Sequence, residues 1–481
     1  MITGEGYRIT VLSSCLFRIE VNKNNIFTDE PTQIVFYRDF PKVEYSVSGK
    51  RFIIIATADS SLCFDTKMRK VFWAVPKGMK RRTKCDNKGN LKGTYRTLDQ
   101  KFKAFELNDG ILSKRGVAVM KDNTLCFDEK GEIIPRKAKG KDFYIFAHGH
   151  DYFGALKDFF ALTGNPPAVP RFALGNWWSR YRAYTQEEYM GVINAFEENK
   201  VPLTVATIDM DWHWTDLNTK FGTNYPGRPL MENPCTGGWT GYSWNTDLFP
   251  DYKAFLKWLH DKNLKTTLNL HPASGVRWFE DMYEDMCREL GVDPSTKQDI
   301  PFDITDPKFI NAYFKILHKP YEKDGVDFWW IDWQQGKKTK IPGLDPLYAL
   351  NHFHYLDNGK DNKEPLILSR YAGLGSHRYP LGFSGDTFTN WAILDFIPYF
   401  TSTASNAGYT WWSHDIGGHM FGRRDDELYL RWIQFGVFNP ILRLHSTCNE
   451  LESKEPWRYG RVAEVFAKKY LRLRKQLVPY L

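Results

Sequence analysis

The stretch 326–336, VDFWWIDWQQG, places one carboxylate, Asp332, at the end of an apolar and aromatic run. A carboxylate in such surroundings is costly to desolvate unless nearby charges or hydrogen bonds compensate it. Polar residues also end other apolar runs of the chain, namely Asp209, Asp211, Asn269, His271, Arg370, Asp386, His414, Asp415, Arg443 and His445. One such acid alone would suit a structural role, but their recurrence at successive strand ends indicates a shared site.

Two carboxylates on different strands, flanked by aromatic side chains and arginine, suit the hydrolysis of a glycosidic bond. One carboxylate acts as nucleophile or base, and the other acid donates a proton to the leaving oxygen. This division of labour needs two acids whose pKa values are separated, so that one is ionised and the other protonated near neutral pH. The sequence therefore predicts a glycosidase-type pair among these acids.

The elements that must position these acids form a repeating pattern after residue 170. Near-continuously apolar runs, typical of strands covered on both faces, alternate with helical segments. Thr185 and Glu188 form a capping box at the start of one such helix. The strand-like runs are RFALGNWW, LTVATIDMDW, KTTLNLHP, VDFWWIDW, PLILSRY, GFSGD, YTWWSHDIGG and NPILRLHS. They predict an α/β fold, a (β/α)8 TIM barrel over residues 171–481 with its polar strand ends at one face. A doubly wound sheet is the main alternative, but no Gly-rich phosphate turn follows the first strand.

The N-terminal part of the chain has a different pattern. Residues 1–150 contain short alternating runs separated by turn residues, which predicts an N-terminal β-sandwich domain. Residues 151–170 then give a short amphipathic helix and a linker to the barrel.

The barrel resembles glycoside hydrolase family 31, a family of retaining α-glycosidases with an N-terminal β-sandwich. The run WWIDW matches the family's nucleophile motif at the end of the fourth barrel strand. The later run SRYAGLGSHRYPLGFSGD carries Ser369, Arg370, Gly385 and Asp386 in the family's order. The resemblance implies that Asp332 is the nucleophile, which forms a covalent glycosyl-enzyme, and that Asp386 is the acid/base.

Further motifs extend the resemblance to the sugar-binding residues: IDMDW, HDIGG and RLHS. The resemblance implies that Arg370, Asp209 and His445 hold the hydroxyls of the terminal sugar, with Asp415 and His271 in the same substrate-binding set. Trp177, Trp329 and Trp412 are expected to wall the pocket. No cofactor and no metal is expected, and the partner is an oligosaccharide or glycoside substrate.

Departures from the family pattern leave the sugar open. The family commonly continues the nucleophile motif with Asn-Glu, where this chain has Gln334 and Gln335, and Asp332 and Asp386 are only 54 positions apart. An α-glucosidase-like activity is the main expectation, with α-galactosidase or α-N-acetylgalactosaminidase as alternatives. The chain stops in KYLRLRKQLVPYL, within the expected last barrel helix, so the barrel is expected to be minimal or incomplete there, without the family's C-terminal β-domains.

Other classes of function fit the sequence less well. A noncatalytic carbohydrate-binding barrel would tolerate loss of Asp332 or Asp386, yet both acids are present. A metal-dependent hydrolase is suggested by His148 and His150, but this pair precedes the barrel, and Asp151 suits the N-cap of the following helix.

The composition of the chain limits which binding partners and which cellular location are expected. The net charge of +8 is not concentrated on one basic face, so no nucleic-acid partner is expected. No apolar run is long enough for a membrane span. Seven scattered cysteines predict reduced thiols, and the N-terminus reads as a strand rather than a leader. We therefore expect a cytoplasmic protein, with its oligomeric state open.

Overall fold

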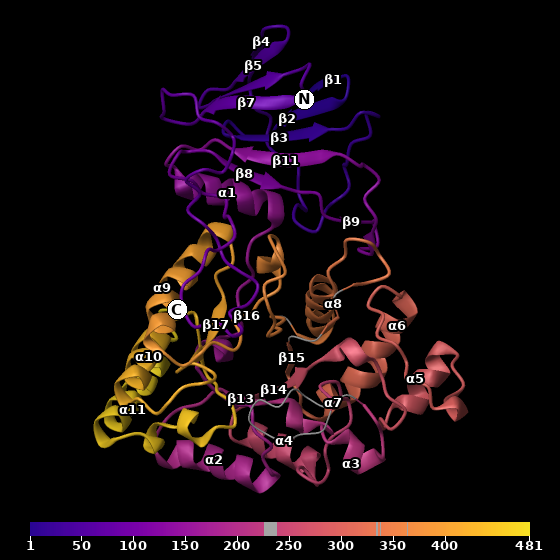
Figure 1. Ribbon diagram of the computed structural model, residues 1–481, viewed down its shortest axis with the longest axis vertical. Coiled ribbons are helices and arrows are strands. Elements are labelled where there is room, and N and C mark those ends of the chain that lie inside the picture. The colour runs from indigo at the N-terminus through magenta and orange to yellow at the C-terminus, as the bar shows by residue number, and fades with distance from the viewer. Residues whose placement is uncertain (226–237, 333–334, 337, 363) are drawn as a thin grey trace.

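The computed structural model describes residues 1–225, 238–332, 335–336, 338–362 and 364–481. Antiparallel sheets built from the N-terminal part lie at one end of the molecule (Figure 1). A curled parallel sheet with its helices forms the other end. Among the described residues, no helix combines the length and the apolar character needed to span a bilayer.

Two antiparallel sheets make up most of the N-terminal part. One has the strand order β1-β2-β3-β11-β8 and the other β4-β5-β6-β7. A single hydrophobic cluster combines Ile9, Phe17 and Ile145 of the first sheet with Ile53 and Phe64 of the second, so the two sheets share one core. The strands, with the small β9-β10 pair, are β1 (Ile2–Gly4), β2 (Tyr7–Val11), β3 (Leu16–Val21), β4 (Ser46–Ser48), β5 (Phe52–Ala56), β6 (Ser61–Asp65), β7 (Lys70–Val75), β8 (Ala118–Lys121), β9 (Cys126–Phe127), β10 (Ile133–Ile134) and β11 (Lys141–Phe146).

Helix α1 (Tyr152–Thr163) follows these sheets. The Asp151 carboxylate accepts a hydrogen bond from the Gly154 amide at 2.9 Å, which confirms the predicted N-cap. The two histidines before it have different partners. His148 contacts Asp158 of α1 at 2.9 Å, whereas the exposed His150 contacts the Lys114 carbonyl. Two residues of the HGHD motif, His148 and Asp151, therefore contact α1.

The second part of the chain is built on a seven-stranded parallel sheet with the order β15-β14-β13-β12-β18-β17-β16. Apart from Lys265 at the start of β14, the residues of its strands are buried, as in strands covered on both faces. They are β12 (Asn176–Arg180), β13 (Val205–Ile208), β14 (Lys265–Leu270), β15 (Phe328–Ile331), β16 (Gly382–Phe383), β17 (Trp412–Ile416) and β18 (Ile441–Leu444).

The two edges of this sheet meet the same short segment, residues 366–369. The Ile331 amide of β15 donates to the Leu368 carbonyl at 2.7 Å. On the other side, the Phe383 amide of β16 donates to the Ser369 carbonyl at 2.8 Å. Parallel bridges accompany both contacts. Backbone hydrogen bonds thus run from β15 through the PLILSRY run to β16.

Helices cover the outer face of the parallel sheet (Figure 1). The capping box at the start of α2 is confirmed, because the Thr185 hydroxyl accepts from the Glu188 amide and the Glu188 carboxylate accepts from the Thr185 amide. The helices are α2 (Gln186–Glu198), α3 (Leu217–Phe221), α4 (Tyr252–Asp261), α5 (Tyr283–Leu290), α6 (Pro307–Ala312), the π-helical η5 (Tyr313–His318), α7 (Lys319–Asp324), α8 (Pro346–Asp361), α9 (Trp391–Ala404), α10 (Asp426–Phe438) and α11 (Arg461–Leu477).

Helix α11 is fixed to the sheet by one buried cation. The Arg474 guanidinium donates to the carbonyls of Leu174, Val437, Asn439 and Pro440 at 2.5–2.9 Å. These carbonyls flank the starts of β12 and β18, so a single side chain satisfies several backbone groups at the N-terminal side of the sheet.

An extended arm, which we define as residues 92–108, connects the two parts of the molecule. It belongs to the N-terminal part but has no strand of its own. The Leu98 amide donates to the Ser384 carbonyl at 2.7 Å, and the Gln100 amide donates to the Asp386 carbonyl at 2.8 Å. The arm therefore lies against the carboxyl end of β16, beside a predicted catalytic acid.

Candidate active site

Alternation along the parallel strands decides which side chains reach the site. Successive side chains of a strand point to opposite faces. On β15, Trp330 contacts the rings of Phe383 and His445 inside the curled sheet, whereas Trp329 contacts His318 in the helical layer. A residue that lies two positions after an inward-facing residue on the same strand therefore also faces the interior. The strand-end residues brought together in this way are Asp209, Asn269, His271, Asp332, Asp415, Arg443 and His445.

Asp332 lies at the end of β15 and is surrounded by donors. Its Oδ1 accepts from the Arg370 guanidinium and its Oδ2 from the Asn269 amide, both at 2.9 Å, and His271 Nε2 lies 3.6 Å from Oδ2. Burial raises the pKa of Asp332, but Arg370, His271 and Asn269 outweigh it and hold the pKa below its ordinary value. Because 14% of the side chain remains exposed, this ionised carboxylate is accessible to a substrate.

Asp386 follows β16 and has the opposite electrostatic character. Burial, together with the charges of Asp99 and Asp332, raises its pKa to about 7, although His419 and Arg370 lower it. Its side chain is 36% exposed, so the acid reaches the site mouth. Asp332 and Asp386 thus form the pair with separated pKa values that glycoside hydrolysis requires.

Arg370 and Asp99 link the two acids. Arg370 Nη2 donates to Asp332, and Nη1 donates to Asp99 Oδ1 at 2.7 Å and to Thr97 Oγ1 at 2.6 Å. Asp99 Oδ1 also accepts the Asp386 amide at 2.9 Å. Gly385 passes this junction with φ +95°, and a Cβ there would lie 1.9 Å from Asp99 Oδ1, so only glycine fits. Sequence reasoning missed Asp99, which lies on the arm.

Three of the predicted sugar-binding residues, Asp209, Asp415 and His445, have polar partners other than Asp332. His445 Nε2 lies 3.8 Å from Asp209 Oδ2, and His445 Nδ1 is paired with Ser179 Oγ at 2.7 Å. Burial lowers the pKa of His445 well below its ordinary value, so this imidazole is neutral near pH 7. Asp415 is ion-paired with Arg443 in the interior.

One half-buried aromatic ring lies near Asp332, the predicted nucleophile. Trp239 contacts His271 edge-on, with ring centroids 5.1 Å apart, and His271 in turn faces Asp332. Sequence reasoning missed this residue because it belongs to no strand. Its position makes it a candidate wall for a sugar ring.

The three tryptophans predicted as pocket walls lie in the core instead. Trp177 is fully buried at the lower level of the sheet interior and donates to the Ala173 carbonyl. Trp329 donates to Glu322 of α7, and Trp412 contacts Phe400 of α9. Each is at most 3% exposed, so none presents a face to a substrate. Trp329 and Trp412 have the outward parity of their strands, which is the physical reason for the correction.

Two other polar strand-end residues have partners outside the pair formed by Asp332 and Asp386. His414 contacts Thr401 of α9 at 2.8 Å, because its position on β17 alternates with the inward Asp415. Asp211 accepts a hydrogen bond from Thr215 at 2.9 Å. Gln334 lies outside the described residues, and Gln335 is buried.

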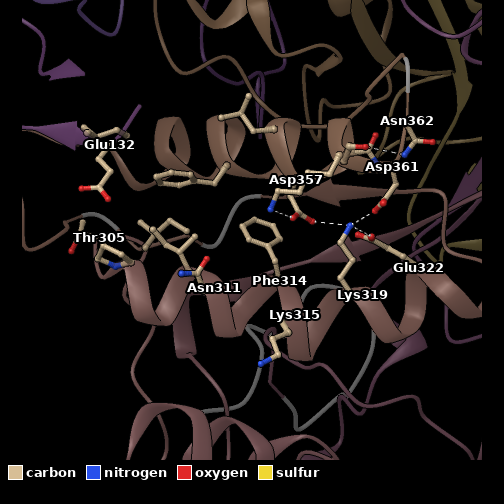
Figure 2. Close-up of a pocket in the computed structure, with 18 of the residues that line it drawn as sticks. Glu132, Thr305, Asn311, Phe314, Lys315, Lys319, Glu322, Asp357, Asp361 and Asn362 are labelled. Carbon is tan, nitrogen blue, oxygen red and sulfur yellow. Dashed lines mark hydrogen bonds and ion pairs between the residues drawn. The ribbon is translucent and has the colours of Figure 1, made fainter. Parts of the chain in front are cut away.

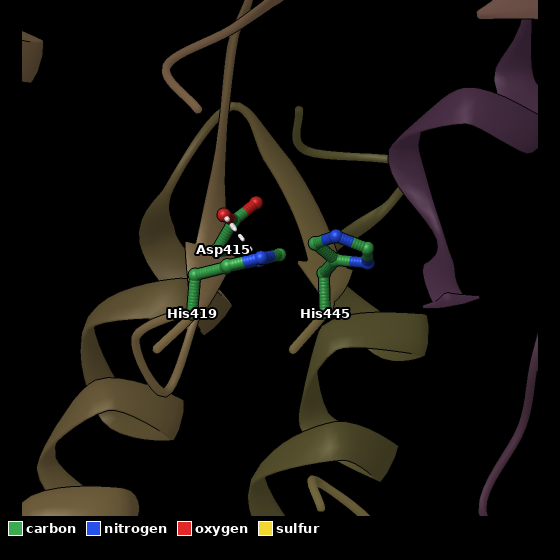
Figure 3. A group of neighbouring side chains, drawn as sticks. All are labelled: Asp415, His419 and His445. Atoms are coloured by element: carbon green, nitrogen blue, oxygen red, sulfur yellow. Dashed lines mark ion pairs between the residues drawn. The ribbon is translucent and has the colours of Figure 1, made fainter. Parts of the chain in front are cut away.

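Asp415, His419 and His445 offer three potential metal ligands within 4.8 Å of one another (Figure 3). Arg443 already neutralises Asp415. Burial lowers the pKa of His419, but Asp386 and Asp415 raise it, and the resulting pKa is about 9. A fixed cation and a protonated imidazole both oppose a metal ion. The cluster is therefore better described as a charged network beside Asp386.

A cavity of about 1130 Å³ lies elsewhere, in the helical layer between α6–α7 and α8. Figure 2 shows Lys319 among its lining residues, paired with Glu322, Asp357 and Asp361. None of the strand-end acids lines it. Its charges are compensated locally, so this cavity does not compete with the strand ends as the candidate site.

Replacing Asp209 with asparagine is expected to stabilise the protein in a pH-dependent way. Burial and the Asp332 charge raise the pKa of Asp209 from 3.8 to about 8, so ionising this acid destabilises the native state. The stabilisation should be small near pH 5 and grow as pH rises to 8, where roughly 2–4 °C or more in Tm is expected. Thermal unfolding at pH 5, 7 and 8.5 measures it. Asp211→Asn is the control, and a gain for Asp209→Asn that does not change with pH would contradict the assignment.

Comparison with known proteins identifies the family of the second part of the chain. A profile described as the glycosyl hydrolases family 31 TIM-barrel domain matches residues 166–481. An alpha-xylosidase of Saccharolobus solfataricus is 28% identical over 407 residues, covering 77% of this chain and 51% of the relative. Alpha-glucosidase 2 of Bacillus thermoamyloliquefaciens is 24% identical over 389 residues, covering 74% of this chain and 45% of the relative. The chain thus spans about half the length of these curated relatives.

Solved structures show the same fold. A dextranase of Flavobacterium johnsoniae complexed with glucose superposes with a TM-score of 0.71 at 20% identity, covering 98% of this chain and 66% of the dextranase. An alpha-xylosidase from a soil metagenome, complexed with xylose, gives a TM-score of 0.67 at 18% identity, covering 100% of this chain and 83% of the xylosidase. Since the profile spans well over half of the sequence, the chain belongs to glycosyl hydrolases family 31.

Proposed function

We propose that this chain carries the catalytic site of a retaining, exo-acting α-glycosidase that cleaves terminal α-linked sugars. The observation that carries the proposal is the pair formed by Asp332 and Asp386. One acid is held ionised by Arg370, and the other has a pKa of about 7. The α-xylosidase and α-glucosidase relatives support α-xylosides and α-glucosides as substrates ahead of α-galactosides.

The proposed reaction has two displacements. Asp332 attacks the anomeric carbon while Asp386 gives its proton to the leaving oxygen, which forms a covalent glycosyl ester. The negative charge of Asp332 is one of the causes that raise the pKa of Asp386. Ester formation removes this charge, so the pKa of Asp386 falls. Asp386 is then able to take the proton of the water that hydrolyses the ester.

We also propose the finer architecture predicted from the sequence. Residues 366–369 act as the remaining strand that closes the parallel sheet into a (β/α)8 barrel, supported by their hydrogen bonds to both edges. The two N-terminal sheets form a β-sandwich, supported by their shared core. The domain limits 1–150, 151–170 and 171–481 and the cytoplasmic location remain sequence-based proposals.

The proposal is tested with a panel of nitrophenyl α- and β-glycosides of glucose, xylose, galactose and N-acetylgalactosamine. We expect nitrophenol release from α-glycosides alone, with α-xyloside or α-glucoside fastest, and no loss of activity after treatment with a chelator. Release from β-glycosides alone, or activity abolished by the chelator, would overturn the proposal. Sugar binding without any release would favour the noncatalytic carbohydrate-binding barrel.

A further inference from the structure

His419 follows the Gly417–Gly418 turn at the end of β17 and is fixed between two strand ends. Its amide donates to the Thr387 carbonyl at 3.0 Å, and its carbonyl accepts from the Thr447 amide at 3.1 Å. Gly418 has φ +79°, and a Cβ there would lie 2.6 Å from the Thr389 Cα. This close approach holds the backbone of His419 against the segment that carries Asp386.

The imidazole of His419 lies between two carboxylates. Its Nδ1 is 3.3 Å from Asp415 Oδ2 and 3.8 Å from Asp386 Oδ1, and its ring lies 4.9 Å from the neutral ring of His445. Only 5% of His419 is exposed. The titratable and charged groups that face this part of the site are Asp209, Asp386, Asp415, Arg443, His445 and Lys454.

The charges around His419 favour its protonated form. Burial lowers its pKa, but Asp386, Asp415 and Asp209 raise it, and the resulting pKa is about 9. Arg443 is committed to Asp415. Among the charged neighbours that lower the pKa of Asp386, His419 acts more strongly than Arg370.

We infer that His419 is a positioning residue for the acid/base step, an imidazolium held by Asp415 against Asp386, which stabilises the Asp386 carboxylate once its proton has passed to the leaving oxygen. The inference rests on the proposed function of Asp386. His419 keeps its own proton throughout, so the only proton transferred in this step moves from Asp386 to the glycosidic oxygen. When water attacks the glycosyl ester, its proton returns to Asp386.

Removing this cation should change the pH profile of the enzyme. In His419→Gln the Asp386 carboxylate loses an opposite charge, so its pKa rises, and the alkaline limb of kcat/KM should move up by roughly one pH unit. His419→Lys, which restores a cation, should bring the limb back toward the wild-type position. The matched control is His414→Gln, which removes a buried imidazole of β17 whose hydrogen-bond partners are Thr401 of α9 and Ser384 rather than Asp415 or Asp386, and it should leave the limb in place.

A second measurement needs no turnover. Nuclear magnetic resonance of the enzyme labelled with ¹⁵N-histidine gives the pKa of His419, with the signal assigned by its loss in His419→Gln. We expect an imidazolium at pH 7, and Asp386→Asn should lower the pKa of His419, because the coupling between two sites is reciprocal. A neutral His419 at pH 7, or a pKa that does not respond to Asp386→Asn, would overturn the inference.

The two measurements separate this inference from the proposed function. If the wild type cleaves no glycoside of the panel, the proposed function fails, and the resonance titration still decides whether His419 and Asp386 are coupled. If the wild type cleaves α-glycosides but the alkaline limb stays in place in His419→Gln, or the pKa of His419 does not respond to Asp386→Asn, the inference alone fails.

Discussion

Replacing Asp332 with alanine is expected to lower kcat by about 10³-fold or more on a nitrophenyl α-glycoside while the protein stays folded. The variant lacks the oxygen that attacks the anomeric carbon, and Arg370 retains Asp99 and Thr97 as partners. Azide added to the variant should restore part of the rate by entering the vacated space. Because azide then attacks the α-glycoside directly, the product should be the β-glycosyl azide.

The control for this experiment is Asp327→Asn. Asp327 belongs to the same VDFWWID run, but it lies before β15 and pairs with Lys265 and His260 at the opposite end of the sheet. Residues at that end of a barrel are expected to contribute to stability rather than to catalysis. Its kcat should stay within a few-fold of the wild type. Turnover of Asp332→Ala near the wild-type rate, with no response to azide, would show that another group attacks the sugar.

Replacing Asp386 with alanine should produce a loss that depends on the leaving group. For a disaccharide, whose leaving oxygen needs a proton, we expect kcat/KM to fall by about 10²–10⁴-fold. For a dinitrophenyl glycoside, which departs without a proton, the first step should be nearly unchanged, and the glycosyl-enzyme should accumulate because no base activates water. Steady-state rates on both substrates, and the burst of dinitrophenol, measure this difference.

Azide distinguishes the role of Asp386 from that of Asp332. In Asp386→Ala, azide attacks the β-linked glycosyl ester on Asp332, so the product should be the α-glycosyl azide, of retained configuration. Equal losses on both substrates, or a β-azide product, would refute the assignment of Asp386 as acid/base. The opposite configurations expected from the two alanine variants follow from one mechanism and need no assumption about the sugar.

The sequence was sufficient for seven of the eight strand runs and for the polar residues at their ends, because both follow from short-range patterns; the PLILSRY run makes only isolated bridges. Apolar runs of strand length followed by a polar residue have one favourable arrangement, with the polar residue at the carboxyl end of the sheet. The alternation of side chains along β15 also explains why the prediction for Trp329 was wrong. Asp332 and Trp330 share a parity, so Trp329 had to face the helices.

The parts that the sequence did not predict depend on segments without periodicity. Asp99 lies on an arm with neither a strand nor a helix, and its contacts with Arg370 and Asp386 bridge more than 250 positions. Trp239 follows no regular element. His419 carried a local signal, four positions after Asp415 in HDIGGHM, but only the bend at Gly417 and Gly418 directs its ring toward Asp386.

The arm also bears on how such enzymes can be divided and recombined. The family profile begins at residue 166, yet the Arg370 guanidinium that contacts Asp332 also donates to Thr97 and Asp99, far upstream of that limit. A chain cut at the profile boundary would leave Arg370 buried with Asp332 and without these two acceptors, which is unfavourable for a desolvated cation. The unit that can be exchanged between relatives is therefore larger than the profile. It has to include residues 92–108 together with Arg370 and Gly385, because Thr97 and Asp99 contact Arg370 and Asp99 also accepts the Asp386 amide.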